Sequence, residues 1–135
     1  MIFLDSWVWC EYVFEGDSFD AANQTIDRAA DEGGLVASTV LAEVSYVVRR
    51  ESDRETANRA VEAIRGFDEI DSVPVTDDVA LRGAELRDKY YERGEREMSY
   101  ADTIHLAVAS MIDCDALYTG DPDFRGVEEV DTVVL

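Results

Sequence analysis

The sequence predicts an α/β fold with three layers, in which helices cover both faces of a short, mainly parallel central sheet. Short apolar runs of strand length alternate with longer segments of helical pattern along all 135 residues, which is typical of such sheets. No repeat or low-complexity linker interrupts this alternation, and the chain has only two prolines. The hydrophobic fraction of 47% is sufficient for one continuous core. We therefore expect a single domain over residues 1–135.

In the first half, a short apolar run leads directly into Asp5 and a helical segment rich in aromatic residues. Gly33 and Gly34 are placed to end the second helix, since glycine is the usual residue just beyond a helix C-terminus. Ser38 or Thr39 is placed to cap the third. The elements expected here are Ile2–Leu4, Trp7–Phe14, Phe19–Glu32, Leu35–Ala37, Val40–Glu51 and Glu55–Gly66.

The second half continues the alternation and ends in a strand. Thr76 is the natural N-cap of one helix, and a later segment that is apolar on nearly all sides predicts a central, buried helix. The elements expected here are Val73–Val75, a helix from Asp77 to about Arg93, Met98–Ile112, Ala116–Thr119 and Val130–Leu135.

The charge balance is extreme: 31 acidic residues face 12 basic ones, for a net charge of −19. Lys89 is the only lysine. Such an acidic surface repels nucleic acid in dilute salt, but at about 1 M salt the Debye length is roughly 3 Å and only local contacts matter. The composition predicts a protein of a high-salt cytoplasm, or an acidic protein that binds a basic partner.

Neither a membrane segment nor a signal peptide is predicted. No stretch approaches the roughly 20 apolar residues of a spanning helix, and the start of the chain lacks a basic leader. We therefore expect a cytoplasmic protein.

Three carboxylates each stand alone in an otherwise uncharged stretch. They are Asp5 within Met1–Cys10, Glu43 within Leu35–Val48, and Asp102 within Met98–Ile112, with His105 taken as neutral. An unpaired acid in sequence of core character is costly. Carboxylates that converge within about 4 Å repel by roughly 4 kcal/mol per pair at an effective dielectric near 20. A bound cation accounts for all three at once, and the ends of parallel strands are where ligands bind.

Four motifs in order resemble the PIN-domain nucleases, in particular the small VapC-type toxins of toxin–antitoxin systems. The resemblance covers the whole chain. The motifs are Ile-Phe-Leu-Asp at 2–5, Ser-Thr-Val-Leu-Ala-Glu-Val at 38–44, Tyr-Ala-Asp-Thr-Ile-His-Leu-Ala at 100–107, and Tyr-Thr-Gly-Asp-Pro-Asp-Phe at 118–124.

This resemblance implies an acidic site at Asp5, Glu43, Asp102 and Asp121, holding one or two Mg²⁺ or Mn²⁺ ions. It implies that the chain hydrolyses RNA to leave a 5′-phosphate and a 3′-hydroxyl, with a small antitoxin protein as partner and a homodimer as the assembly. A metal-bound water supplies the nucleophile in such chemistry, so that no histidine base is needed.

The fourth acid has a neighbour that competes with it. Asp121 and Asp123 lie in the same turn, and Pro122 favours an extended backbone at Asp121, which we prefer. Thr119, or Ser38 and Thr39, are expected to orient a ligand or a metal-bound water through a hydroxyl group.

Each acid also has a structural interpretation. Ser99 to Asp102 matches a capping box, Glu43 is a candidate ion-pair partner of Arg49 or Arg50, and Asp5 is a candidate helix cap. Two further groups are expected to be structural. They are His105, as a satisfied core residue rather than a base or ligand, and the aromatic residues Trp7, Trp9, Tyr12 and Phe14, as core or a dimer face rather than groups that stack on bases.

Basic residues gather in two groups, which are candidates either for contacts to RNA phosphates or for surface ion pairs. Arg49 and Arg50 are the preferred RNA contacts, because they follow Glu43 on one helix.

Two other functions compete with the nuclease. One is a catalytically silent PIN scaffold that binds RNA or protein. The other is an Mg²⁺-dependent phosphoacceptor receiver domain, which needs a lysine late in the sheet, whereas Lys89 falls in a predicted helix.

Overall fold

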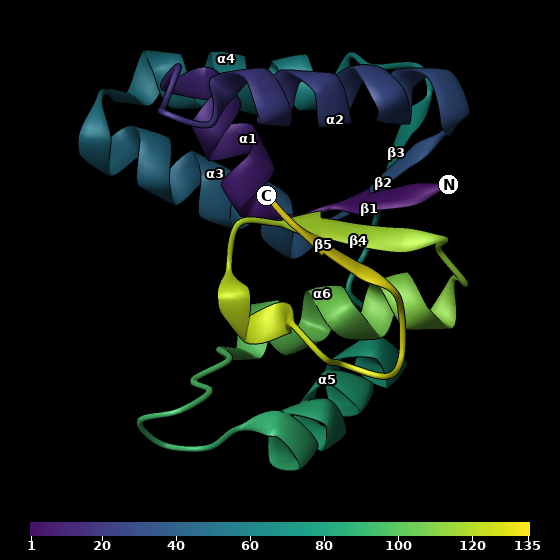
Figure 1. Cartoon of the computed structure of the whole chain (residues 1–135). Helices are drawn as coiled ribbons and strands as arrows, with labels where there is room; N and C mark the ends of the chain where they lie inside the picture. The colour runs from purple at the N-terminus through teal and green to yellow at the C-terminus, as the bar shows by residue number, and fades with distance from the viewer.

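Five parallel strands form the central sheet of the computed structural model, which describes residues 1–135 (Figure 1). The strands lie in the order β3-β2-β1-β4-β5, and every neighbouring pair is parallel. Their bounds are β1 Ile2–Leu4, β2 Gly34–Ala37, β3 Ile70–Val73, β4 Ala116–Thr119 and β5 Thr132–Val134. The predicted short parallel sheet is confirmed.

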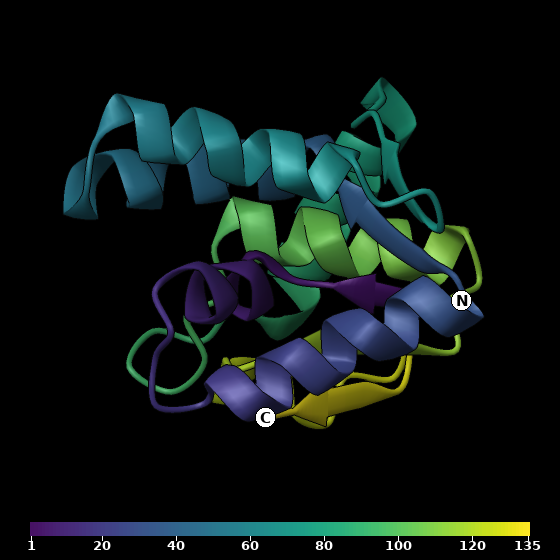
Figure 2. The ribbon, with the colours of Figure 1, turned by 90° about the horizontal axis from the view of Figure 1, so that it is seen from above.

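Helices cover both faces of this sheet (Figures 1 and 2). They are α1 Ser6–Val13, α2 Phe19–Glu32, α3 Ser38–Glu51, α4 Arg54–Arg65, α5 Asp77–Tyr90 and α6 Tyr100–Met111. In Figure 1, α1 and α2 lie above the sheet, whereas α6 lies below it with α5 outside. The α3–α4 hairpin packs on β2 and β3 and projects past the sheet. The predicted three-layer α/β/α architecture is therefore confirmed.

The order of the strands creates a switch point between β1 and β4. From β1 the chain adds β2 and then β3 on one side, and the crossover through α5 and α6 returns it to the other side of β1. A crevice opens at the carboxyl ends of two strands where the winding direction reverses. Asp5 directly follows β1, and Thr119 is the last residue of β4, so both lie at this switch point.

The core is continuous through all three layers. Phe3 and Leu4 of β1 are fully buried, as are Leu117 of β4 and Leu106 of α6, and Ile26 of α2 is 2% exposed. Burial of each such side chain contributes about 1.5–3 kcal/mol. The carboxyl ends of β1 and β4 are thus anchored in well-packed structure.

No helix of the chain has the length and apolar character that a membrane span requires.

Among the N-caps predicted from the sequence, Thr76 and Ser99 are correct, whereas the Ser38 or Thr39 cap is wrong. Thr76 caps α5 through Val79 N–H, and Ser99 caps α6 in a complete capping box. Helix α3, in contrast, begins at Ser38, and its N-cap residue Ala37 offers no side-chain bond. The Ser38 hydroxyl instead accepts a hydrogen bond from Val75 N–H. A bond to a distant segment has replaced the local cap.

Two predicted boundaries were also wrong. The third strand is Ile70–Val73 rather than Val73–Val75, because Ile70 pairs with Gly34 and buries its side chain while the next two residues are exposed at the sheet edge. Helix α5 ends at Tyr90 rather than near Arg93. A tight turn with Gly94 at φ +81° follows it and pairs Glu92 with Arg96.

A tight contact beside the site gives a stability prediction. A Cβ atom on Gly120 would overlap the indole ring of Trp7. Gly120→Ala should therefore lower the free energy of unfolding by about 1–3 kcal/mol, the usual cost of overpacking. Urea denaturation measures this loss, and the double variant with Trp7→Ala is the control. If the two substitutions are additive rather than compensating, the overlap is not the cause.

Candidate metal centre

Asp5 is held at the end of β1 by its backbone and by both carboxylate oxygens. Its N–H donates to the carbonyl of Tyr118 on β4 at 3.0 Å. Oδ1 lies 2.8 Å from Nδ1 of His105, and Oδ2 accepts from the Thr119 hydroxyl at 2.7 Å. Asp5 is the N-cap residue of α1, as the helix-cap interpretation expects, but its side chain makes no cap hydrogen bond.

Asp5 is only 4% exposed, and its charge depends on these hydrogen bonds. Burial alone raises the pKa of this carboxyl, but the bonds from His105 and Thr119 outweigh burial, and the net pKa lies below its ordinary value. Asp5 is thus ionised at neutral pH. Each oxygen contacts one protein side chain, and a carboxylate has about four lone-pair sites in all, so the group can also bind a cation.

Glu43 lies on α3 and faces Asp5. Its Oε1 accepts from the Ser6 hydroxyl at 3.1 Å and lies 3.7 Å from Nε2 of His105. Burial raises the pKa of Glu43, the nearby His105 lowers it, and Asp5 raises it further, with a net increase. No arginine pairs with this carboxylate, so the ion-pair interpretation with Arg49 or Arg50 was wrong.

Asp102 combines a cap with a place in the acidic group. Its Oδ2 accepts from Ser99 N–H at 2.8 Å, and its own N–H donates to the Ser99 hydroxyl at 3.1 Å. The predicted capping box is therefore confirmed. Burial raises the pKa of Asp102, the bonds from Ser99 lower it, and the charges of Asp5 and Asp121 raise it, with a net increase. The carboxylate thus lies within electrostatic reach of two other acids.

Asp121 and Asp123 are directed differently. Asp121 begins the 3-10 turn Pro122–Phe124, and its N–H donates to the Thr119 hydroxyl at 3.1 Å. The same hydroxyl binds Asp5, so Thr119 links the two acids. The carboxylate of Asp123 instead accepts from Glu97 N–H at 3.2 Å, in the loop before α6. The Asp121 carboxylate accepts from Asp123 N–H at 2.9 Å, but its charge also raises the pKa of Asp102, which favours Asp121 as the fourth acid.

The structure brings Asp5 and Glu43 into one compact group with His105, whereas Asp102 and Asp121 lie outside that group. Asp5, Glu43 and His105 each offer an atom within 4.8 Å of the other two, and Asp102 and Asp121 adjoin this group electrostatically. Carboxylate oxygens are the donors that Mg²⁺ and Mn²⁺ prefer. The raised pKa values of Glu43 and Asp102 show that their charged forms are disfavoured in the protein alone. A divalent cation fits this group because it removes that penalty.

His105 has a role that the sequence analysis missed. It is fully buried, as expected of a core residue, but both ring nitrogens contact residues of the site, Asp5 and Thr39. Its spacing from Asp102 was the available signal, because residues three apart share one helix face. The aromatic residues of α1 pack as core only in part: Trp9 is 1% exposed, whereas Phe14 is 40% exposed.

The fold and the acidic site define a nuclease of the PIN class. The family described as "PIN domain" matches residues 2–130, and the chain belongs to this family. PIN-domain proteins are nucleases, which are hydrolases that cleave phosphodiester bonds. No curated protein sequence matches the chain.

Solved structures agree with this assignment. VapC20 of Mycobacterium tuberculosis, described as a sarcin-ricin loop cleaving toxin, is 26% identical, with coverage of 97% of this chain and 99% of that chain and a TM-score of 0.75. VapBC2 of Rickettsia felis, solved bound to a promoter DNA fragment, is 16% identical, with 99% and 98% coverage and a TM-score of 0.77. FitAcB of Neisseria gonorrhoeae is 20% identical, with 98% and 96% coverage and a TM-score of 0.69.

Burial of the acids, together with repulsion among them, predicts how stability depends on pH without metal. A carboxyl whose pKa is raised by folding binds more protons in the folded than in the unfolded state, so stability falls as pH rises through that pKa. Glu43→Gln should therefore raise the melting temperature at pH 7, by about 1–3 °C because solvent screens a partly exposed group.

At a pH below the ordinary pKa of Glu43, the variant and the wild type should melt alike. Glu69→Gln, at an exposed position next to β3, is the matched control. Calorimetry in a chelating buffer makes the measurement. A Glu43→Gln protein that is less stable than the wild type at pH 7 would contradict the account.

Proposed function

We propose that the chain is a divalent-metal-dependent endoribonuclease and the toxin of a toxin–antitoxin pair, acting in the cytoplasm as a single nuclease domain over residues 1–135. The grouping of Asp5 and Glu43 at the β1–β4 switch point carries this proposal, and the electrostatic influence of Asp5 and Asp121 on Asp102 supports these two as further members of the site. Membership of the PIN family supports the nuclease chemistry. The similarity to VapC20, itself described as a toxin that cleaves the sarcin-ricin loop, supports RNA as substrate.

The four acids would hold one or two Mg²⁺ or Mn²⁺ ions, which lower the pKa of a bound water and polarise the phosphoryl oxygen. The protein's own contribution is orientation. Thr119 fixes Asp5 and the Asp121 backbone, Ser6 fixes Glu43, and the capping box fixes Asp102. Residues held by packing and by second contacts keep the geometry that such chemistry requires.

Arg49 and Arg50 remain the predicted contacts to RNA phosphates. Helix α3 begins beside the site and ends in these two exposed arginines, neither of which forms an ion pair in the structure. Local cations are needed on a chain with a net charge of −19, because the overall field repels RNA unless salt screens it.

The same site distinguishes the nuclease from the two competing functions, the receiver domain and the silent scaffold. A receiver domain needs a lysine beside its phosphorylated aspartate, whereas Lys89 lies on α5 and binds Glu128 and Glu129. A silent scaffold has no need of four acids around one point. The nuclease therefore accounts best for the arrangement.

Cleavage of RNA is the test of this proposal. In high salt with Mn²⁺ or Mg²⁺, the wild type should cleave an RNA stem-loop, and a chelator should stop cleavage. Asp5→Asn and Asp102→Asn should each lower the rate by about 100-fold or more, since residues that merely support a metal ligand already cost 10- to 100-fold. Gel analysis of end-labelled RNA makes the measurement.

The turn after β4 supplies a matched pair of variants for this assay. Asp121→Asn should lower the rate as the other two substitutions do, whereas Asp123→Asn should leave most of it, because Asp123 is bonded to the loop before α6. Undiminished cleavage by Asp5→Asn and Asp102→Asn would refute the site. Metal binding without cleavage of any RNA would favour the scaffold.

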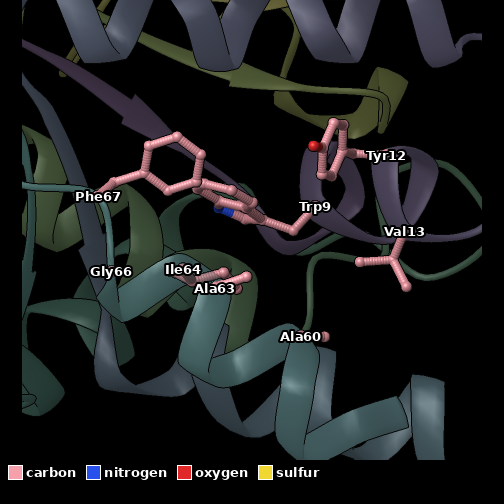
Figure 3. Close-up of a pocket in the computed structure, with 8 residues that line it drawn as sticks. All are labelled: Trp9, Tyr12, Val13, Ala60, Ala63, Ile64, Gly66 and Phe67. Atoms are coloured by element: carbon pink, nitrogen blue, oxygen red, sulfur yellow. The ribbon is translucent and has the colours of Figure 1, made fainter.

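An apolar groove between α1 and α4 is our proposed docking site for the antitoxin. Figure 3 shows Trp9, Tyr12 and Val13 of α1 facing Ile64 of α4, with Phe67 beyond it, around a cavity of about 270 Å³. An antitoxin segment with apolar side chains fits this groove, because nearly all of its lining is hydrophobic.

A charge in the groove should separate antitoxin binding from catalysis. Ala63→Glu places a carboxylate among apolar groups and should weaken binding of the small protein encoded beside the toxin at least about tenfold, or 1.4 kcal/mol. RNA cleavage should be unchanged. Ala80→Glu, an exposed alanine on α5, is the matched control. Calorimetric titration of each variant with the antitoxin measures this affinity. Wild-type affinity in Ala63→Glu would mean that the antitoxin binds elsewhere.

The homodimer remains a prediction, which light scattering at working salt tests.

A further inference from the structure

The ring of His105 contacts the three elements that carry three of the proposed ligands. Its Nδ1 lies 2.8 Å from Oδ1 of Asp5 at the end of β1, and its Nε2 lies 2.8 Å from Oγ1 of Thr39 at the start of α3. Thr39 precedes Glu43 by one helical turn, and Asp102 precedes His105 by one turn on α6. One buried ring thus joins β1, α3 and α6 at the point where the acids converge.

The partners assign the hydrogen-bond roles of the ring. A carboxylate can only accept, so Nδ1 carries a proton and donates to Asp5. In the neutral ring Nε2 is then an acceptor, and the Thr39 hydroxyl donates to it. The ring is 0% exposed and packs on Phe3, with ring centroids 5.6 Å apart. Both ring nitrogens are thus engaged by neighbouring side chains.

From this geometry we infer that His105 is a positioning residue, which fixes the Asp5 carboxylate and the spacing of β1, α3 and α6 so that the acidic oxygens converge on the divalent ion. The inference rests on the metal site of the proposed function and adds a residue to it. Asp5 rotates freely about its last torsion unless both oxygens are held. Thr119 holds Oδ2, and His105 is the group that holds Oδ1.

The competing interpretation is that His105 is itself a ligand through Nε2. That atom lies 3.7 Å from Oε1 of Glu43, and the three residues form one compact group. Two observations favour positioning. Nε2 is already engaged by Thr39, and the remaining donors are carboxylate oxygens, which suit Mg²⁺ and Mn²⁺ better than an imidazole does.

Three variants separate the two roles. His105→Leu keeps much of the buried volume and removes both nitrogens, His105→Asn returns an N–H donor near the position of Nδ1 alone, and Thr39→Val removes only the hydroxyl. The primary measurement is the dissociation constant for Mn²⁺, followed by electron paramagnetic resonance in high salt, with calorimetry of the metal-free proteins to show that each is folded.

His105→Leu should weaken Mn²⁺ binding about 10- to 100-fold, as loss of a group that supports a metal ligand does. His105→Asn should recover most of the affinity, and Thr39→Val should lose less than His105→Leu. In RNA cleavage the His105→Leu effect should fall on kcat, with KM for RNA unchanged, because the ring does not touch the substrate.

Wild-type Mn²⁺ affinity in His105→Leu would overturn the inference. So would His105→Asn binding as weakly as His105→Leu while Thr39→Val binds like the wild type, because the loss would then follow Nε2 itself rather than its bond to Thr39. Should His105→Leu fail to fold, His105→Asn with near wild-type affinity supports positioning and a 10-fold or greater loss refutes it. A wild type that binds no Mn²⁺ would instead refute the metal site of the proposed function, which distinguishes the two failures.

Discussion

Repulsion among carboxylates gathered at the carboxyl ends of β1 and β4 is the constraint on which the rest of the site depends. Each acid is held there by its own hydrogen bonds: His105 and Thr119 bind Asp5, Ser6 binds Glu43, and Ser99 binds Asp102. These bonds lower the net pKa only for Asp5, whereas the pKa values of Glu43 and Asp102 remain raised. The protein alone therefore leaves a charge penalty that a divalent cation removes.

The fold supplies the position where this arrangement is possible. Asp5 and Thr119 lie at the ends of adjacent parallel strands because the crossover through α5 and α6 brings β4 next to β1. Helices α3 and α6 carry Glu43 and Asp102 to the same end of the sheet. On the other side of α1, the groove facing α4 is apolar. Catalysis and antitoxin binding are thus assigned to separate surfaces that share α1.

The features that the sequence predicted well are those with a local signal. Alternating apolar runs predicted the layers, and Ser99 predicted its own capping box. The misses depend on long-range partners. Ser38 accepts a hydrogen bond from Val75 N–H instead of capping α3. Strand β3 lies at the sheet edge, and its one buried residue, Ile70, gives almost no alternating hydrophobic pattern. The contact of His105 with Asp5 joins residues that lie 100 positions apart, which periodicity within one helix does not reveal.

The central claim is that the acids form one cation site organised around Asp5. Diffraction from crystals soaked in Mn²⁺, recorded at the manganese absorption edge, tests it most directly. The account predicts an anomalous peak within coordination distance of oxygens of Asp5 and at least two of Glu43, Asp102 and Asp121, with Nδ1 of His105 still bonded to Asp5. A peak coordinated by Nε2 of His105, or no peak at this site in saturating Mn²⁺, would contradict it.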